Sequence, residues 1–282
     1  MKATLSVICL LAAIMSIQTS HADCVSPGMI GWWQAEGNAL DSAGTNHGTI
    51  SGATFTSGKV GQSFSLDGTG HVSLGTQVGN FGAADFTLEF WLASTNGARL
   101  DVILGKRSIC GIANFWNLFL RPDGRVNVEW CSGLSGTFNL DSATHVNNGL
   151  YHHVAWRREG TNYSLSIDGV MEAAMGLPLV NFNNPAALLI GNNPCVGPGG
   201  ATRLIGQVDE LALHNRALSL AELQAISNAG SLGHCGLGPT LNTTGLPGAV
   251  RLTWTTNAIG YLLETNSALT FPAGWGGARV QL

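Results

Sequence analysis

Regular alternation of apolar and polar residues constrains this chain more than any other feature of its sequence. In the segment FTLEFWL, residues 86–92, every second residue is large and apolar. The segment FWNLFLRPDGRVNVEW, residues 115–130, holds two such runs around Asp123-Gly124, and residues 151–170 repeat the arrangement. A period of two is typical of β-strands, and Asp-Gly between two runs indicates a hairpin. The chain is therefore predicted to form antiparallel sheets.

The composition agrees with short strands joined by tight turns. Glycine accounts for 38 of the 282 residues, and only 11% of the residues are charged. Glycine readily adopts the positive φ angles that tight turns require. About 210 residues lie between Cys24 and Cys235, a length that a single all-β sandwich can fill. We therefore predict one all-β domain built from two packed sheets.

One short helix is expected at the C-terminal end of this domain. Ser219 and Glu222 have the spacing of a capping box, and Leu218 before the cap can pack on Leu223. Gly230 is suited to end the helix. The pattern predicts a helix that lies over the sandwich.

The first 22 residues have the pattern of a secretory signal peptide. Lys2 precedes the apolar run Leu5–Ile17, and Ser20-His21-Ala22 offers a cleavage site of small residues. The apolar run is shorter than the ~20 residues of a membrane-spanning helix. We therefore predict a secreted protein, cleaved after Ala22, with no membrane span.

The chain is expected to divide into four parts. Residues 1–22 form the signal peptide, and residues 24–235 form the main domain. Residues 236–249 are rich in glycine, proline and threonine and are predicted to be a linker. Residues 250–282 again show strand patterns but are too few to close a sandwich. They are predicted to be a truncated second β module or a small β-rich appendage.

Five cysteines are left after cleavage, and they are Cys24, Cys110, Cys131, Cys195 and Cys235. Disulfides persist outside the cytoplasm, and an odd number leaves one thiol unpaired or bonded to another molecule. A bond between Cys24 and Cys235 would join the two ends of the domain. Cys110 can pair with Cys131 across one hairpin, so the pairing of the other three stays open at this point.

Two neighbouring carboxylates, Asp209 and Glu210, stand in the strand pattern RLIGQVDELAL. Neighbouring strand residues point to opposite faces, which would place Asp209 on the side of Leu211 and Leu213. Two carboxylates on opposite faces cannot act together on one glycosidic bond. An ionised Asp beside leucines needs a cation, backbone N–H groups or an arginine such as Arg216. Calcium is the candidate cation, because it prefers oxygen ligands.

A second oxygen-rich segment, EGNALDSAGTNHGTI, could supply the other calcium ligands. Glu36, Asp41 and Asn46 lie in this glycine-rich loop, which can turn carbonyl oxygens inward. Calcium takes about 6–8 such oxygens. The alternative is a polar loop held by Asx-turns, and loop chemistry alone favours it.

Three tryptophans are candidates for stacking on a sugar ring. Trp33 follows Trp32 in the first strand pattern, so one of the two rings should face outward. Trp116 and Trp130 are further candidate platforms, because an aromatic face suits the apolar face of a pyranose. Packing in the core is the alternative for each of them.

Five segments in this order carry a resemblance to a known family: GMIGWWQAEGNALDSAGTNHGTI, GKVGQSFSLDGTGHVSLG, DFTLEFWL, YHHVAWRREGTNYSLSIDGV and GQVDELALHNRALSLAELQAI. Together they resemble the laminin-G-like, concanavalin A-like jelly-roll domains of secreted bacterial proteins, over about residues 28–230. The resemblance implies a two-sheet antiparallel jelly-roll sandwich. It also implies a structural calcium, with ligand candidates Glu36, Asp41, Asn46 and Asp209, and the disulfides Cys24–Cys235 and Cys110–Cys195, with Cys131 left over.

The sequence shows no catalytic cluster. Glycosidases of this fold carry carboxylates at alternating positions of one strand, whereas Glu89 has no second carboxylate two residues on and Glu129 is isolated. There is no nucleophile elbow, phosphate loop or zinc-binding helix motif. His152 and His153 are adjacent in a strand, point to opposite faces and cannot hold one zinc ion, so a structural role is expected.

A recognition function follows as the expectation. The 13 basic and 17 acidic residues disfavour nucleic acid as a partner. We expect a secreted, non-catalytic module that binds a polysaccharide or glycoconjugate and carries a structural Ca²⁺. The first alternative is an adhesion or spacer module of a larger surface protein without a small ligand, for which a protein partner is compatible with the fold. A polysaccharide hydrolase or lyase is the less favoured alternative.

Overall fold

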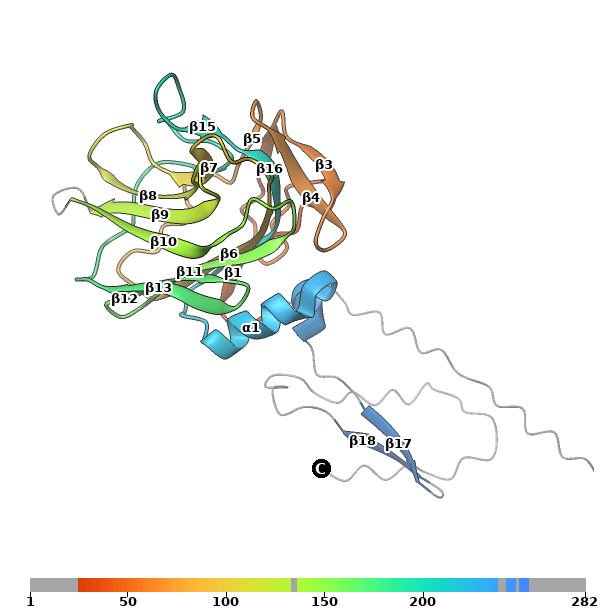
Figure 1. Ribbon diagram of the computed structural model, residues 1–282. Coiled ribbons are helices and arrows are strands. Elements are labelled where there is room, and N and C mark those ends of the chain that lie inside the picture. Colours follow the sequence, from red (N-terminus) through yellow and green to blue (C-terminus); the bar gives the residue numbers. More distant parts are fainter. Residues whose placement is uncertain (1–24, 133–135, 238–241, 247–248, 254–282) are drawn as a thin grey trace, which may run out of the picture.

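Two eight-stranded sheets packed face to face form the body of the molecule (Figure 1). The computed structural model describes residues 25–132, 136–237, 242–246 and 249–253. It confirms the predicted all-β sandwich with one short C-terminal helix. The predicted signal peptide, Cys24 and the last part of the predicted second module, 254–282, lie outside the described residues. No helix in the described part is long and apolar enough to span a membrane.

Each sheet brings together strands that are distant in the sequence. Sheet A has the order β13-β12-β11-β6-β16-β4-β3, with β1 also paired to β16, and sheet B has the order β10-β9-β8-β7-β14-β5-β2, with β15 also paired to β7. The strands of sheet A are β1 (Met29–Trp33), β3 (Thr54–Ser57), β4 (Gln62–Asp67), β6 (Phe86–Ala93), β11 (His152–Glu159), β12 (Asn162–Ile167), β13 (Val170–Gly176) and β16 (Ile205–His214). The strands of sheet B are β2 (Thr49–Ser51), β5 (His71–Ser73), β7 (Asp101–Lys106), β8 (Asn114–Leu120), β9 (Arg125–Ser132), β10 (Thr137–His145), β14 (Leu188–Ile190) and β15 (Thr202–Arg203).

The hairpins expected from the sequence are present. β8 and β9 pair antiparallel around a turn in which Gly124 has a φ of 86°. β11 and β12 pair around Gly160, and β12 and β13 pair around Asp168-Gly169. Asp168 itself has a φ of 51°, a conformation that Asp tolerates better than most residues. The turn residues therefore place these strands as predicted.

Strand β6 shows how the core is built. Phe86, Leu88, Phe90 and Leu92 point between the sheets and belong to the main apolar cluster. The residues between them are buried as well, so every residue of β6 is shielded from solvent. Burial on both faces requires a further layer outside sheet A, to which the C-terminal helical segments contribute.

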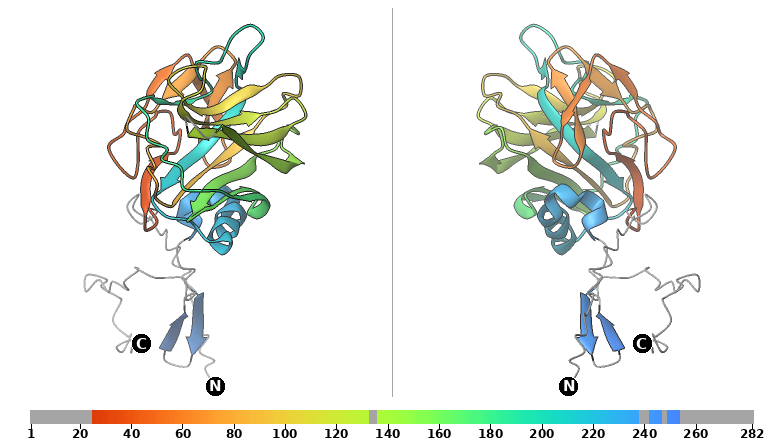
Figure 2. Two further views of the ribbon diagram at one scale, coloured as in Figure 1. Left: turned by 90° about the vertical axis from the view of Figure 1, so that its left-hand side faces the viewer. Right: turned by 90° about the vertical axis from the view of Figure 1, so that its right-hand side faces the viewer.

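Helix α1 (Leu220–Ala229) is part of that outer layer. The Ser219 side chain accepts a hydrogen bond from the backbone N–H of Glu222, and the Glu222 carboxylate accepts one from the backbone N–H of Ser219, which confirms the capping box. Leu218 and Leu223 pack together against Ala155 of β11. Gly230 ends the helix, and the short 3-10 helical segment η2 (Gly230–Leu237) follows. Both views of Figure 2 show these helices at one end of the sandwich.

The predicted orientation of Asp209 is wrong, because β16 contains a β-bulge. Asp209 pairs with Trp91 and Ala212 pairs with Glu89, so β16 holds one residue more than β6 over this stretch. Glu210 takes up the extra residue with a φ of 53°. The bulge puts Val208 and Leu211 in the core and turns both carboxylates away from it. The two carboxylates therefore do not point to opposite faces.

The structure decides between the two disulfide pairings left open by local geometry. Cys110 is bonded to Cys195, which joins the loop after β7 to the loop after β14. Cys131 is a buried free thiol, which rules out the alternative Cys110–Cys131 bond. Cys235 is disulfide-bonded, and its predicted partner Cys24 lies outside the described residues.

A separate antiparallel pair follows the sandwich. It consists of β17 (Asn242–Leu246) and β18 (Ala249–Thr253). β17 lies within the predicted linker 236–249. Strand structure therefore begins earlier than the composition indicated.

Candidate functional site

The three tryptophans proposed as sugar platforms are buried, and this part of the sequence prediction is wrong. Trp33 is 1% exposed, and Trp116 and Trp130 are 0% exposed. All three belong to the apolar cluster between the sheets, where Trp130 stacks on Tyr163 with ring centroids 5.2 Å apart. The side chains at these three strand positions point between the sheets, so each tryptophan is a core residue.

Asp41 organises the N-terminal loop by hydrogen bonding. Its carboxylate accepts backbone N–H groups of Trp32, Ala43, Gly44 and Asn46 at 2.9–3.1 Å. These donors occupy the oxygens that would otherwise face a cation. The polar-loop alternative therefore describes Asp41, whose carboxylate is held by four backbone N–H groups.

Asp209 and Glu36 lie around the turn between β3 and β4. Asp209 Oδ2 accepts the Val60 N–H at 2.9 Å, and Glu36 Oε1 accepts the Gln62 N–H at 3.1 Å. Asp209 Oδ1 is buried without a hydrogen-bond partner. Burial raises the pKa of Asp209 to about 7, and the charge of Glu36 contributes to the rise. Arg216 does not neutralise Asp209, because it pairs with Glu222.

The four predicted calcium ligands do not form one site. Among the described residues, no three His, Cys, Asp or Glu side chains are grouped as metal ligands. Asp209 keeps one buried carboxylate oxygen without a hydrogen-bond partner, which suits a cation. Glu36 lies at the same turn and could supply a second carboxylate. Two carboxylates supply only part of the 6–8 oxygens that calcium takes. Calcium at this pair stays a prediction.

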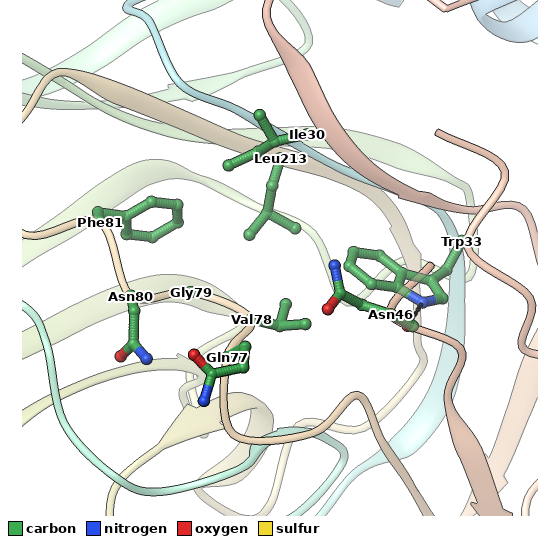
Figure 3. Close-up of a pocket in the computed structure, with 9 residues that line it drawn as sticks. All are labelled: Ile30, Trp33, Asn46, Gln77, Val78, Gly79, Asn80, Phe81 and Leu213. Atoms are coloured by element: carbon green, nitrogen blue, oxygen red, sulfur yellow. Dashed lines mark hydrogen bonds between the residues drawn. The ribbon is translucent and has the colours of Figure 1, made fainter. Parts of the chain in front are cut away.

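A small pocket lies at one end of the sandwich, between Trp33, Phe81 and Leu213 (Figure 3). The amide side chains of Asn46, Gln77 and Asn80 also line it, but its volume is only about 80 Å³. Sites for small molecules usually measure about 300–1,000 Å³. The pocket is therefore too small to enclose a whole sugar ring.

The outer face of sheet B carries a larger set of polar side chains, arranged by strand register. Asn117 of β8 lies opposite Glu129 of β9, which lies opposite Asn139 of β10. In the next row, Asn127 lies opposite Asp141. Alternation places these residues on the side facing away from the core. We call this surface the amide face and define it as Asn117, Asn127, Glu129, Asn139 and Asp141 with the guanidinium groups of Arg107 and Arg121.

Planar polar groups of the amide face are held by one another. Asp141 accepts hydrogen bonds from Arg121 at 3.0 Å and from Asn127 at 2.8 Å. Glu129 accepts hydrogen bonds from Arg107 at 3.4 Å and from Asn117 at 3.3 Å. The positions of the polar atoms are thereby fixed before any ligand binds, which lowers the entropy cost of binding.

Part of the amide face is open to solvent. The Glu129 side chain is 25% exposed, and those of Asp141 and Arg121 are 32% and 38% exposed. Asn139 is exposed, whereas Asn117 is buried at the other end of the same row. The accessible side therefore lies over β9 and β10.

Two loops cover the closed side of the amide face. Asn193 donates to Asn117 Oδ1 at 3.2 Å. The backbone oxygen of its neighbour Asn192 approaches Gly105 so closely that a Cβ at residue 105 would lie 2.5 Å from it. The Cys110–Cys195 bond ties this loop to the loop after β7. That second loop exposes two apolar side chains, Ile109 and Ile112. Arg107 of the amide face donates to Ile109 O and Gly111 O, so the polar groups lie beside this partly apolar loop.

Sequence reasoning missed the amide face, although a signal was present. The runs FWNLFL and RVNVEW place Asn117, Asn127 and Glu129 at alternating positions opposite the apolar residues. Glu129 looked isolated because its partners lie on other strands. Only the pairing of β8, β9 and β10 brings these side chains together.

A family model for the concanavalin A-like lectin/glucanases superfamily matches residues 66–224, more than half of the chain. The chain belongs to this superfamily. The match spans most of both sheets and the beginning of α1, which agrees with the resemblance seen in the sequence. No curated protein matches the sequence.

Solved structures of similar fold have low sequence identity to this chain. The binding domain of Paraclostridial Mosquitocidal Protein 1 has a TM-score of 0.59 and 14% identity, over 77% of this chain and 61% of that chain. Domain 4 of AbnA, an extracellular arabinanase from Geobacillus stearothermophilus, in complex with arabinotriose, has a TM-score of 0.58 and 18% identity, over 70% and 96%. The binding domain of botulinum neurotoxin DC in complex with rat synaptotagmin II has a TM-score of 0.54 and 8% identity, over 82% and 63%. This chain thus covers less than two thirds of the length of the mosquitocidal-protein domain and of the neurotoxin domain.

Proposed function

We propose that this protein is a secreted, non-catalytic recognition module that binds carbohydrate through the amide face. The observation that carries the proposal is the pair of cross-strand rows ending in Asn139 and Asp141, which are fixed by internal hydrogen bonds and partly open to solvent. Amide, carboxylate and guanidinium groups together offer the donors and acceptors that neighbouring sugar hydroxyls require.

The alternative of an enzyme has less support. Asp209 and Glu210 are 0% and 1% exposed, so a polymer chain cannot reach either carboxylate. Glu89 is also buried, at 0% exposure. The carboxylates that a polymer can reach on the amide face, Glu129 and Asp141, are held by arginine side chains. Both carboxylates are engaged in hydrogen bonds within the amide face.

The known complexes of similar domains support a ligand-binding role in two ways. Domain 4 of the arabinanase is in complex with arabinotriose, which favours a carbohydrate ligand here. The neurotoxin domain is in complex with synaptotagmin II, which favours a protein ligand. We prefer carbohydrate because the open part of the amide face is polar, whereas the centre of a protein interface is usually apolar and depleted in charge.

A glycan array tests the proposal. We expect the protein to bind at least one polysaccharide or glycoconjugate, and Asn139→Ala and Asp141→Ala each to weaken that binding at least fivefold, the equivalent of about 1 kcal/mol. Glu159→Ala is the matched control, because Glu159 is an exposed carboxylate at the end of β11 in sheet A. It should leave the affinity unchanged.

Three results would contradict the proposal. The first is the absence of binding to any glycan, which would favour the adhesion or spacer function. The second is glycan binding that survives both amide-face substitutions, which would place the site elsewhere. The third is turnover of a polysaccharide that one carboxylate substitution abolishes, which would make the protein an enzyme.

Calcium binding by Glu36 and Asp209 is a separate proposal and is tested separately. We expect calcium to raise the melting temperature of the wild type, because a ligand that binds only the folded state stabilises it. The Asp209→Ala variant should show no such rise. An equal response of both proteins would exclude Asp209 as a ligand.

A further inference from the structure

Four titratable side chains meet in the layer outside sheet A, far from the amide face. They are Glu89 of β6, His153 of β11, His214 of β16 and His234 of η2. Their exposed fractions are 0%, 0%, 0% and 3%. We call them the buried histidine cluster. Three strands of one sheet and the C-terminal segment η2 thus share one set of polar contacts.

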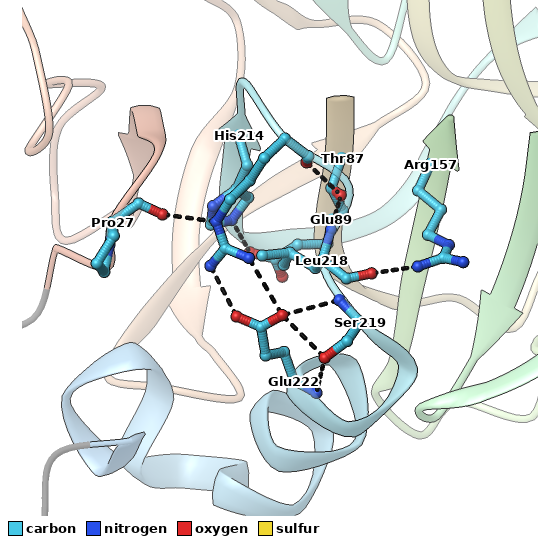
Figure 4. Close-up of polar contacts among 9 residues, drawn as sticks. Pro27, Thr87, Glu89, Arg157, His214, Leu218, Ser219 and Glu222 are labelled. Carbon is cyan, nitrogen blue, oxygen red and sulfur yellow. Dashed lines mark hydrogen bonds and ion pairs between the residues drawn. The ribbon is translucent and has the colours of Figure 1, made fainter. Parts of the chain in front are cut away.

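Glu89 is the centre of the cluster. His153 Nε2 lies 2.8 Å from Glu89 Oε2, and His234 Nε2 lies 2.9 Å from Glu89 Oε1. His214 Nε2 lies 3.6 Å from the same Oε1, an approach that Figure 4 shows from the side of helix α1. The three contacts surround both carboxylate oxygens. His234 supplies the one contact that joins η2 to Glu89.

The buried carboxylate needs one compensating positive charge. An ionised group inside a protein is costly unless it is paired. Glu89 forms ion-pair contacts with histidines only, among the described residues. Burial by itself would raise the pKa of Glu89, but the charge of His234 and the hydrogen bond with His153 hold it well below its usual range. Glu89 is therefore ionised at neutral pH.

His234 is the histidine that supplies the charge. Burial by itself would lower the pKa of His234, but the charges of Glu89 and Glu210 raise it. Burial lowers the pKa of His214, which disfavours its charged form. A proton on His234, beside the Glu89 carboxylate, is the arrangement that fits these surroundings.

Other charged groups surround the cluster on every element packed against it. Glu210 lies on β16 near His234, and burial raises its pKa to about 8. Arg216, after β16, acts on His214 and pairs with Glu222 of α1. Lys59 lies over the Trp91 ring. Asp209 acts on Glu210, and Glu36 acts on Asp209. The ion pair of His152 and Asp168 lies next to His153, whose backbone N–H donates to Asp168. No contact joins Lys59 or Arg216 to Glu89 among the ion pairs of the described residues.

We propose that the buried histidine cluster is a pH-sensitive latch that holds Gly230–Leu237 on sheet A while His234 is protonated and releases it as the pH becomes alkaline. Loss of the His234 proton leaves the buried Glu89 charge uncompensated. Glu89 can then be hydrated only if η2 moves away, because η2 is the element of the cluster that is not a sheet strand. The disulfide of Cys235 keeps the segment attached to the protein during such a movement.

The direction follows from the sign of the His234 shift. A histidine whose pKa is higher in the folded state stabilises that state fully below its unfolded value of ~6.5. This stabilisation is lost as the pH rises through the folded value. Glu89 has the opposite shift, so its contribution is lost only in acid, below ~4.5. The latch is therefore closed from mildly acidic to neutral pH and opens above that range.

Hydrogen–deuterium exchange of the intact, disulfide-bonded protein tests the latch. The readout is the protection factor of a peptide that covers Gly230–Leu237, corrected for the intrinsic exchange rate, from pH 5 to pH 9. We expect constant protection below about pH 6.5, then a fall of up to tenfold per pH unit up to the His234 pKa of the folded state, the slope for one linked proton, and a new plateau above it. A peptide from β8, Asn114–Leu120, should keep constant protection. Constant protection of η2 up to pH 9 would overturn the proposal.

Matched variants separate His234 from its titratable neighbours. Glu89→Gln removes the charge that needs compensation, and His234→Gln removes the proton that supplies it, so both should flatten the pH dependence. Glu210→Gln should retain it. A flat profile in Glu210→Gln, or a wild-type slope in His234→Gln, would show that another group controls the segment.

NMR of the wild type keeps the test valid if a variant does not fold. The imidazole signals of His234 should titrate above pH 6.5, with a midpoint at the pH where the loss of protection levels off. Titration at or below that value, or a midpoint unrelated to the loss, would also overturn the proposal.

Discussion

The carboxylate of Glu222 offers the sharpest test of the forces that hold α1 on the sandwich (Figure 4). It accepts hydrogen bonds from Arg216 at 2.7 and 3.1 Å and from the Ser219 backbone N–H at 2.8 Å. Arg216 also donates to the backbone oxygen of Pro27, so the same contacts link the helix start to the segment just before β1. Replacement by glutamine keeps the shape of the side chain and removes its charge.

The size of the effect follows from the pKa of Glu222. The hydrogen bond from Arg216 and the contacts with Ser219 lower this pKa from 4.5 to about 2, against the opposing effect of burial. A shift of about 2.5 units would correspond to roughly 3 kcal/mol at full strength. The Glu222 side chain is 43% exposed, so solvent screens the charge. We therefore expect a loss of about 1–1.5 kcal/mol in Glu222→Gln.

The pH dependence identifies the charge as the cause. A carboxyl group whose pKa is lower in the folded state stabilises that state above its unfolded value, and the contribution disappears as the pH falls through the folded value. The difference in unfolding free energy between wild type and Glu222→Gln should thus be full at pH 7 and shrink steadily between pH 4.5 and about 2. Chemical denaturation at several pH values measures it.

The control for this experiment lies in the same helix. Gln224 is exposed, so Gln224→Ala should change the unfolding free energy by less than about 0.5 kcal/mol at any pH. A difference for Glu222→Gln that stays constant from pH 7 to pH 2 would refute the electrostatic reasoning. The contribution of Glu222 would then come from packing or from the neutral hydrogen bonds of the cap.

Three further predictions concern other parts of the fold. Leu223→Ala should lower the unfolding free energy by about 2–4 kcal/mol because Leu223 is fully buried, whereas Leu220→Ala, at a 39% exposed position, should cost less than about 1 kcal/mol in the same denaturation assay. Cys195→Ser removes the loop disulfide and should lower the unfolding free energy by about 2–5 kcal/mol and weaken glycan binding. Calorimetry measures both unfolding and binding, and unchanged values would mean that the disulfide does not support the amide face. Burial raises the pKa of Asp209 to about 7, so without calcium the wild type should lose stability as the pH rises from 6 to 8, and Asp209→Asn should lose less; parallel melting-temperature profiles would contradict this.

The sequence by itself determined which segments form strands and where the chain turns. Alternation in residues 86–92 and 115–130 identified strands and their apolar sides, because side chains of a strand alternate between its two faces. The capping box of Ser219 and Glu222 located the start of α1 for a similarly local reason, since its donors and acceptors lie within one helical turn. The Cys110–Cys195 bond came only from the family resemblance, because local geometry left a second pairing open.

Only the tertiary structure decided which of those faces are covered and which residues meet. The bulge at Glu210 reverses the orientation predicted for Asp209, because register is set by hydrogen bonds to β6, more than a hundred residues away in sequence. The tryptophans proposed for sugar binding proved to be core residues, since alternation tells two faces apart without showing which one meets solvent. The amide face and the buried histidine cluster depend on strand pairing and on the docking of η2, which no local pattern encodes.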